Sequence, residues 1–193
     1  MAAEGFVLAG GASRRMGKDK AMLDWFGKPL VEHMTSLLTI IASPVRIVGR
    51  GSLPDLHPGI GPLAGILTAL SVTASDINFI VAVDTPLLTY EFLKYFERRT
   101  ISSNRALIAC KIQSGFPLCL GIRRSAQLLA ENYILSGRRS VRGFIEEAQA
   151  ELITVDDLDA LGISPEIFRN LNTESDYQEI LGNGTDPPNH VLY

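Results

Sequence analysis

The sequence has few cysteines, no long apolar run and nearly balanced positive and negative charges. Each of these shortages argues against a class of protein. Only two cysteines, Cys110 and Cys119, occur in 193 residues, and they lack CxxC spacing, so neither a disulfide framework nor a zinc site is expected. Without a basic segment leading into a long apolar run, we expect no export signal and no membrane anchor, and therefore a cytoplasmic protein. The formal net charge of −3 argues against nucleic acid as a partner.

Familiar catalytic patterns are missing as well. The three histidines, His33, His57 and His190, have neither metal-ligand spacing nor a nearby nucleophile pattern, so hydrolysis by a triad has no support. The chain also lacks the GxxxxGK[ST] spacing of a P-loop and the GxGxxG spacing of a dinucleotide-binding fold. Both an ATPase and a dehydrogenase interpretation therefore lose their main support.

Short apolar runs that alternate with helical patterns dominate what is present. The alternation predicts an α/β, Rossmann-like fold with a mostly parallel central sheet and helices on both faces. The expected strands cover residues 5–9, 45–48, 77–83, 106–110 and 117–121, with a late strand near Ile153 and Val155. The expected helices cover residues 29–41, 125–135 and 140–148, with others running through Leu70 and from Thr89 through Phe96.

With 46% apolar residues, the chain can bury one sizeable core. We expect residues 1–181 to form a single domain. Residues 182–193 hold glycine, proline and asparagine with almost no periodic pattern, and we expect them to form a flexible tail.

A loop rich in glycine and cations follows the first expected strand. It reads LAGGASRRMGKDKA from Leu8 to Ala21. Glycine lets backbone N–H groups approach a ligand closely, and arginine and lysine supply charge where a polyphosphate would lie. The alternative is a plain connection whose cations face water. The density of cations favours a nucleoside triphosphate site, in which Asp19 is an acid able to orient a neighbouring lysine.

Asp84 directly follows the apolar run 77–83. Ligands of open α/β sheets bind at the carboxyl ends of strands, where a carboxylate can hold a magnesium ion bound to substrate phosphates. Capping of the turn before Pro86 is the alternative. Together with the glycine-rich loop, Asp84 predicts a metal and nucleotide site.

Two features near the middle of the chain have both a structural and a functional interpretation. The segment Gly61–Gly65, GPLAG, is either a plain turn and helix start or a stretch whose backbone recognises a base. Asp55 lies just upstream and either accepts hydrogen bonds from a guanine edge or a ribose hydroxyl, or is an ordinary exposed loop acid.

Two later features concern a second substrate. Arg138, Arg139 and Arg142 either bind an anionic ligand or form a solvated helix face. Asn170 and Asn172 alternate along the chain, so both amides would point to one side of an extended segment, unless they only shape a turn.

The motifs LAGGASRRMGKDKA, GPLAG, VDTP and NLNTESDY, in this order, resemble the molybdenum cofactor guanylyltransferases over roughly residues 6 to 180. The first motif is common to many nucleotidyltransferases, including cytidylyltransferases, and the combination is more specific. The resemblance implies the fold of the nucleotide-diphospho-sugar transferases. It also implies transfer of GMP from magnesium-bound GTP to molybdopterin or its molybdenum form, giving a guanine dinucleotide and pyrophosphate without a covalent enzyme intermediate.

The resemblance implies roles for individual residues. Lys20 and Arg15 would meet the phosphates and Asp84 would bind Mg²⁺, so these three are the expected catalytic residues. The expected nucleotide-binding residues are Leu8, Ala9, Gly10, Gly11, Gly17, Lys20, Asp55, Gly61, Gly65 and Asp84. The expected acceptor-binding residues are Arg139, Arg142, Asn170 and Asn172, with the arginine alignment loose by one residue.

The sequence departs from the family pattern at two places. Val83 stands where the family often has cysteine, and Phe116 stands where a polar residue is common. A related cytidylyltransferase, a nucleotidyltransferase with another acceptor, and a non-catalytic carrier of GTP or cofactor are the alternatives. Molybdoenzymes and other cofactor-biosynthesis proteins are the partners that the resemblance implies.

Overall fold

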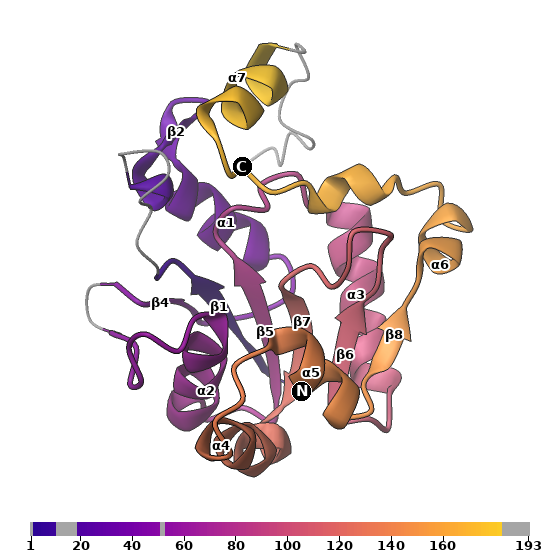
Figure 1. Cartoon of the computed structure of the whole chain (residues 1–193). Helices are drawn as coiled ribbons and strands as arrows, with labels where there is room; N and C mark the ends of the chain where they lie inside the picture. Colours follow the sequence, from indigo (N-terminus) through magenta and orange to yellow (C-terminus); the bar gives the residue numbers. More distant parts are fainter. Residues whose placement is uncertain (1, 11–18, 51–52, 183–193) are drawn as a thin grey trace.

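The computed structural model describes residues 2–10, 19–50 and 53–182. Its centre is a six-stranded sheet of order β4-β1-β5-β7-β6-β8 (Figure 1). Strand β7 is antiparallel to both neighbours, and the other neighbouring pairs are parallel. The strands are β1 (Ala3–Leu8), β4 (Val45–Val48), β5 (Ile77–Ala82), β6 (Leu107–Cys110), β7 (Cys119–Arg123) and β8 (Glu151–Ile153). The predicted, mostly parallel sheet is confirmed.

Helices connect the strands, and a small antiparallel pair of strands lies outside the main sheet. The pair is β2 (Asp24–Trp25) and β3 (Lys28–Pro29). The α-helices are α1 (Leu30–Leu38), α2 (Pro62–Val72), α3 (Tyr90–Ser102), α4 (Gln127–Leu135), α5 (Val141–Glu147), α6 (Val155–Asp159) and α7 (Glu174–Gly182). The 3-10 helices are η1 (Lys20–Met22), η2 (Arg124–Ala126) and η3 (Pro165–Phe168).

Alternating side chains of the central strand β5 build a core on each face of the sheet. Phe79 belongs to a buried cluster with residues of α1 and α3, and its ring centroid lies 5.5 Å from that of Phe96. Its neighbour Ile80 belongs to the opposite cluster, which takes Leu63 from α2 and Phe144 from α5. Because successive strand residues point to opposite faces, one apolar run anchors helices on both sides.

Several predicted boundaries were wrong, among them the end of the helix expected at residues 29–41, which ends at Leu38. Two others have clear local reasons. The strand expected at 117–121 begins at Cys119, because Pro117 has no N–H to donate to a ladder. Val155, expected in the late strand, instead opens α6. The Thr154 side chain accepts a hydrogen bond from the Asp157 N–H, and the Asp157 carboxylate accepts one from the Thr154 N–H, which is a capping box that starts a helix.

The C-terminal part of the described chain lies against its N-terminal part. The last described helix, α7, runs beside β2 (Figure 1), and the Tyr177 hydroxyl donates a hydrogen bond to the Asp24 carbonyl. Helix α7 ends at Gly182. Most of the expected tail, residues 183–193, lies outside the described residues.

The three parallel strands β4, β1 and β5 all end at one edge of the sheet. The Ala9 N–H donates to the Val48 carbonyl at 2.9 Å, and the Val83 N–H donates to the Leu8 carbonyl at 3.1 Å. The segments that follow these strands therefore begin side by side. In the described part of the chain, the helices are too short or too polar to span a membrane.

Candidate active site

A cavity of about 790 Å³ lies at the carboxyl ends of β1, β4 and β5. Among the described residues its lining is Leu8, Ala9, Gly10, Asp19, Lys20, Ala21, Val48, Asp55, Pro58, Gly59, Gly61, Pro62, Gly65, Ala82, Val83, Asp84, Leu118 and Asn170. The sequence pattern predicted ligand binding at the carboxyl ends of the strands, and this edge of the sheet carries a cavity large enough for a nucleotide.

Lys20 and Asp84 meet at this cavity from distant parts of the sequence. Lys20 Nζ lies 3.4 Å from Asp84 Oδ2 and donates a hydrogen bond of 3.0 Å to Asn172 Oδ1. The two charged side chains are 18% and 23% exposed, so solvent screens them only in part. The fold therefore places a cation, a carboxylate and an amide within reach of one ligand.

The two asparagines are positioned by the residue between them. The Leu171 N–H donates a hydrogen bond of 2.8 Å to the Asp84 carbonyl, and the Leu171 side chain is fully buried. This anchor fixes the extended segment alongside the loop after β5. Asn170 then lines the cavity and Asn172 contacts Lys20.

Asp55 also lines the cavity and packs against Gly10. A Cβ on Gly10 would lie 2.9 Å from Asp55 Oδ2 and 3.2 Å from Gly49 Cα, so a side chain there would push the carboxylate away. Burial raises the pKa of the Asp55 carboxyl above its usual value. A carboxylate so placed favours a ligand that supplies hydrogen-bond donors.

The GPLAG segment forms the start of α2 and reaches the same cavity. Gly61 precedes the helix with a φ of +83°, which favours glycine, and Pro62 occupies the first helical turn. A Cβ on Gly65 would lie 3.0 Å from the Leu8 side chain, so glycine lets α2 pack closely on β1. Both glycines line the cavity.

The arginines expected to bind an acceptor lie elsewhere. Arg139 donates hydrogen bonds to the Ile134 and Arg138 carbonyls, at 2.7 and 2.8 Å, and Arg142 pairs with Glu146. Neither is among the described residues that line the cavity. Their role stays a prediction. The predicted Gly11, Arg15 and Gly17 lie outside the described residues.

A second cavity, of about 640 Å³, adjoins the first, because Asn170 lines both. Its other walls come from the segment after β6, the start of α6 and the region of η3, namely Ile112, Gln113, Ser114, Val155, Pro165, Glu166, Phe168 and Arg169. Its side chains include amide, hydroxyl and aromatic groups. No spacing pattern predicted this cavity, because its walls come from three separate segments of the chain.

The sequence pattern also did not predict the contacts that hold the segments around the site in place. The His33 ring nitrogen Nε2 lies 2.9 Å from the Pro86 carbonyl, which ties α1 to the loop after Asp84. Asp19, expected to orient a lysine, pairs with Arg50, and its carboxylate accepts a hydrogen bond from the Ala21 N–H. The only available signal for Arg50 was its position directly after a strand and a glycine.

Comparison with known proteins places this geometry in a family. A family model described as the MobA-like NTP transferase domain matches residues 5–152. A probable molybdenum cofactor guanylyltransferase of Carboxydothermus hydrogenoformans is 32% identical, with 91% of this chain and 93% of the relative covered. The molybdenum cofactor guanylyltransferase of Xanthomonas euvesicatoria pv. vesicatoria is also 32% identical, with 94% and 96% covered.

A solved structure shows the same architecture. The molybdopterin-guanine dinucleotide biosynthesis protein A of Archaeoglobus fulgidus superimposes with a TM-score of 0.76 at 26% identity, covering 93% of this chain and 99% of that one. The fold and the cavity at its sheet edge define a nucleotidyltransferase. The chain belongs to the MobA-like NTP transferase family and, within it, to the molybdenum cofactor guanylyltransferases.

Proposed function

We propose that the protein transfers GMP from GTP to the terminal phosphate of molybdopterin or its molybdenum form. A phosphate oxygen of the acceptor attacks the α-phosphorus of GTP, the bond from that phosphorus to the bridging oxygen breaks, and pyrophosphate leaves. The observation that carries the proposal is the meeting of Lys20 and Asp84 at the first cavity, where Asn172 contacts Lys20 and the nearby Asn170 lines both cavities. The names of the relatives, which are up to 32% identical to this chain, indicate the two substrates.

Phosphoryl chemistry needs charge neutralisation and alignment more than proton transfer. Lys20 supplies a positive charge that is held by Asp84 and Asn172 rather than free to search solvent. Such a preorganised cation stabilises negative charge as it develops on the phosphates. Arg15, outside the described residues, is proposed to add a second cation.

Asp84 fits a magnesium ion that arrives with the nucleotide. Among the described residues, no group of three or more histidine, cysteine, aspartate and glutamate side chains could hold a metal ion. Mg²⁺ commonly takes one or two carboxylates and completes its shell with water and substrate phosphates. When bound, the ion would offset charge on the triphosphate and on the departing pyrophosphate.

The proposal assigns the guanosine to the part of the first cavity near Asp55, Gly61 and Gly65. Guanine presents N–H donors on its Watson–Crick edge, and a ribose presents hydroxyl donors. Either would satisfy the Asp55 carboxylate, whose pKa burial has raised. Cytosine presents fewer donors on that edge, so an Asp55 that binds the base favours GTP over CTP, whereas an Asp55 that binds the ribose does not discriminate between them.

The acceptor is assigned to the second cavity. Because Asn170 lines both cavities, a molecule held in the second cavity can extend a phosphate towards the first. Gln113 and Ser114 offer hydrogen-bonding groups to a heterocycle, and Phe168 offers an aromatic ring. The proposal places this reaction in the cytoplasm, with molybdoenzymes or other cofactor-biosynthesis proteins receiving the product.

Pyrophosphate release tests the proposal. The purified protein is incubated with Mg²⁺, molybdopterin and one of GTP, CTP or ATP, and pyrophosphate and the dinucleotide product are measured. Release that requires both GTP and molybdopterin is expected. Faster release with CTP would overturn the choice of nucleotide, and GTP binding with no release in the presence of acceptor would support a carrier instead.

A further inference from the structure

Arg50 contacts both Ala9 and Asp19, which lie on either side of residues 10–18 of the glycine-rich loop. Its Nε donates a hydrogen bond of 2.9 Å to the carbonyl of Ala9, directly after β1. Its Nη2 pairs with the carboxylate of Asp19, directly before η1. Residues 10–18 lie between these two contacts in the sequence. A single guanidinium therefore sets the position of the end of β1 relative to the start of η1.

The backbone around Arg50 is built for this close approach. Gly49 has a φ of +87°, and a Cβ there would lie 2.5 Å from Gly10 Cα and 2.6 Å from Gly10 N. Only glycine permits the two chains to approach this closely in that conformation. The Gly49 N–H also donates to the Leu53 carbonyl at 2.9 Å, so the residue before Arg50 is held in place.

Asp19 links the Arg50 contact to the position of Lys20. The Asp19 carboxylate caps η1 by accepting a hydrogen bond of 3.1 Å from the Ala21 N–H. Lys20 is the first residue of η1, and its Nζ reaches Asp84 and Asn172. Contacts thus run from Arg50 through Asp19 and η1 to the cation that meets the phosphates.

Charge gives Arg50 a second reason to be there. Asp19 lines the cavity assigned to the triphosphate, where an unpaired carboxylate would repel the ligand. Arg50 itself is not among the described residues that line that cavity. Its guanidinium pairs with the Asp19 carboxylate and neutralises the negative charge of Asp19.

We infer that Arg50 is a positioning residue for the nucleoside triphosphate site, which holds Ala9 and Lys20 in register and neutralises Asp19. The inference rests on the proposed function only in needing a nucleoside triphosphate as ligand, whatever its base. Arginine suits the role because its fork serves a carbonyl and a carboxylate at once, whereas lysine supplies a point charge.

Arg46, which lies in β4 four residues before Arg50, provides a matched control. It also bridges β4 to β1, since its guanidinium pairs with Glu4 at 3.2 Å, and it donates a hydrogen bond of 3.1 Å to the Val72 carbonyl. These contacts lie at the opposite end of the two strands from the cavity. Arg46→Gln thus removes a comparable ion pair without touching the site.

The test measures the dissociation constant of the Mg²⁺-bound triphosphate by calorimetry, and kcat and KM for pyrophosphate release, with unfolding followed in parallel. Arg50→Gln is expected to weaken binding by about tenfold or more, and Arg50→Lys to recover part of the loss. Arg46→Gln should lower the unfolding temperature and leave the dissociation constant within about twofold of wild type.

Asp19→Asn separates positioning from direct phosphate contact. If Arg50 acts through Asp19, Asp19→Asn weakens binding, and the double variant is little worse than Arg50→Gln alone. Tighter binding by Asp19→Asn would mean that the Asp19 carboxylate only repels the triphosphate or keeps Arg50 from it, and this would overturn the positioning role of the pair. So would wild-type affinity in Arg50→Gln. A wild-type chain preferring another triphosphate would overturn only the choice of GTP, and the same variants are then compared with that nucleotide.

Discussion

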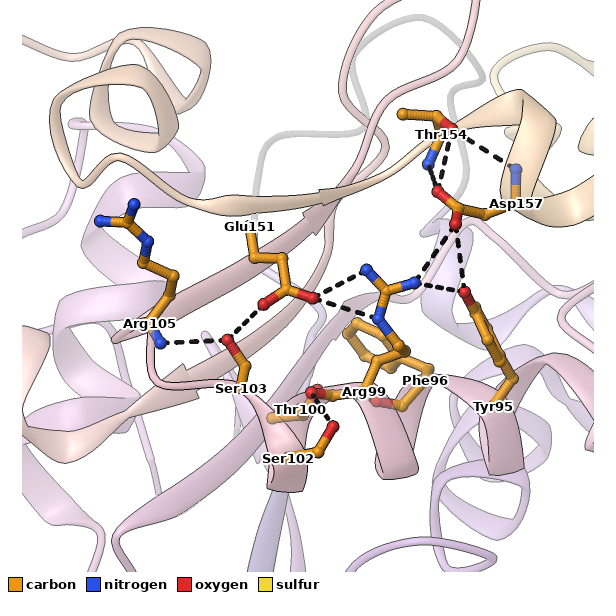
Figure 2. Close-up of polar contacts among 10 residues, drawn as sticks. All are labelled: Tyr95, Phe96, Arg99, Thr100, Ser102, Ser103, Arg105, Glu151, Thr154 and Asp157. Atoms are coloured by element: carbon orange, nitrogen blue, oxygen red, sulfur yellow. Dashed lines mark hydrogen bonds and ion pairs between the residues drawn. The ribbon is translucent and has the colours of Figure 1, made fainter.

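Two polar clusters in this molecule use similar side chains for opposite purposes. One, which we call the Arg99 network, contains Arg99, Tyr95, Ser103, Glu151 and Asp157 and joins α3 to β8 and α6 (Figure 2). The other is the Lys20, Asp84 and Asn172 group at the cavity that Asp55 also lines.

The carboxylates of the Arg99 network are satisfied by the protein itself. Glu151 accepts hydrogen bonds from the Ser103 hydroxyl and from Arg99, and these hold its pKa below the usual value. A hydrogen bond from the Thr154 backbone lowers the pKa of Asp157 in the same way, with help from Arg99. Such a cluster has little to gain from a ligand, because its charges are already paired.

The pKa of Asp55 is shifted in the opposite direction from those of Glu151 and Asp157. Burial raises its pKa, so the folded protein disfavours its charged form until donors arrive. The comparison teaches that a carboxylate left with a raised pKa beside a cavity indicates a binding role, whereas a lowered pKa within a closed network indicates a structural one.

Lys20→Ala should give the largest effect on catalysis. Loss of the cation at the phosphates is expected to lower kcat/KM for pyrophosphate release by about 100-fold or more, with little change in unfolding temperature. Lys94→Ala, which removes the ion pair with Glu97 on α3, is the control and should keep wild-type turnover. Near-normal turnover in Lys20→Ala would remove Lys20 from its proposed role.

Asp55→Asn should alter nucleotide binding less strongly. The affinity for GTP is expected to fall by about tenfold, because a charged acceptor of hydrogen bonds is lost. In the wild type, binding should weaken as the pH falls through the raised pKa of Asp55, since protonation removes the same acceptor. Calorimetric titration across pH checks both effects. An equal pH dependence in Asp55→Asn would show that another group is responsible.

Arg99→Met should lower stability and leave nucleotide binding unchanged, the opposite of what is expected for Lys20→Ala. It leaves Glu151 and Asp157 without their shared cation, so we expect a loss of about 2 kcal/mol in the free energy of unfolding. Denaturant titration measures this change. The dissociation constant for GTP should stay within about twofold of wild type, and a larger change would mean that the network also positions the site.

The smallest effect concerns stability in acid. Because the folded pKa of Glu151 lies below its ordinary value of 4.5, its contribution is present above that value and is lost as the pH falls through the folded pKa. Glu151→Gln should therefore flatten this acid limb. Asp55 has the opposite sign: its raised pKa costs stability as the pH rises, so Asp55→Asn should stabilise the protein at neutral pH. Unfolding free energies measured against pH test both signs.

Much of the fold follows from local patterns, and the site only in part. The strand before Asp84 is apolar except for Asn78, so both the strand and the acid at its carboxyl end were predictable. The group around Lys20 was not predictable from spacing, because Asn172 lies 152 residues away in the sequence. Arg139 and Arg142 were selected by charge and alignment, yet Arg139 bonds to nearby carbonyls and Arg142 pairs with Glu146.

Thermal unfolding of the wild type and of Lys20→Ala with GTP or CTP, each with and without Mg²⁺, tests most directly whether this cavity is the site of GTP. A ligand at 100 times its Kd stabilises a protein by about 2.7 kcal/mol. The account predicts that Mg²⁺ with GTP raises the wild-type unfolding temperature more than Mg²⁺ with CTP, and that Lys20→Ala loses most of this shift. An equal GTP shift in both proteins, or a larger shift with CTP, would contradict it.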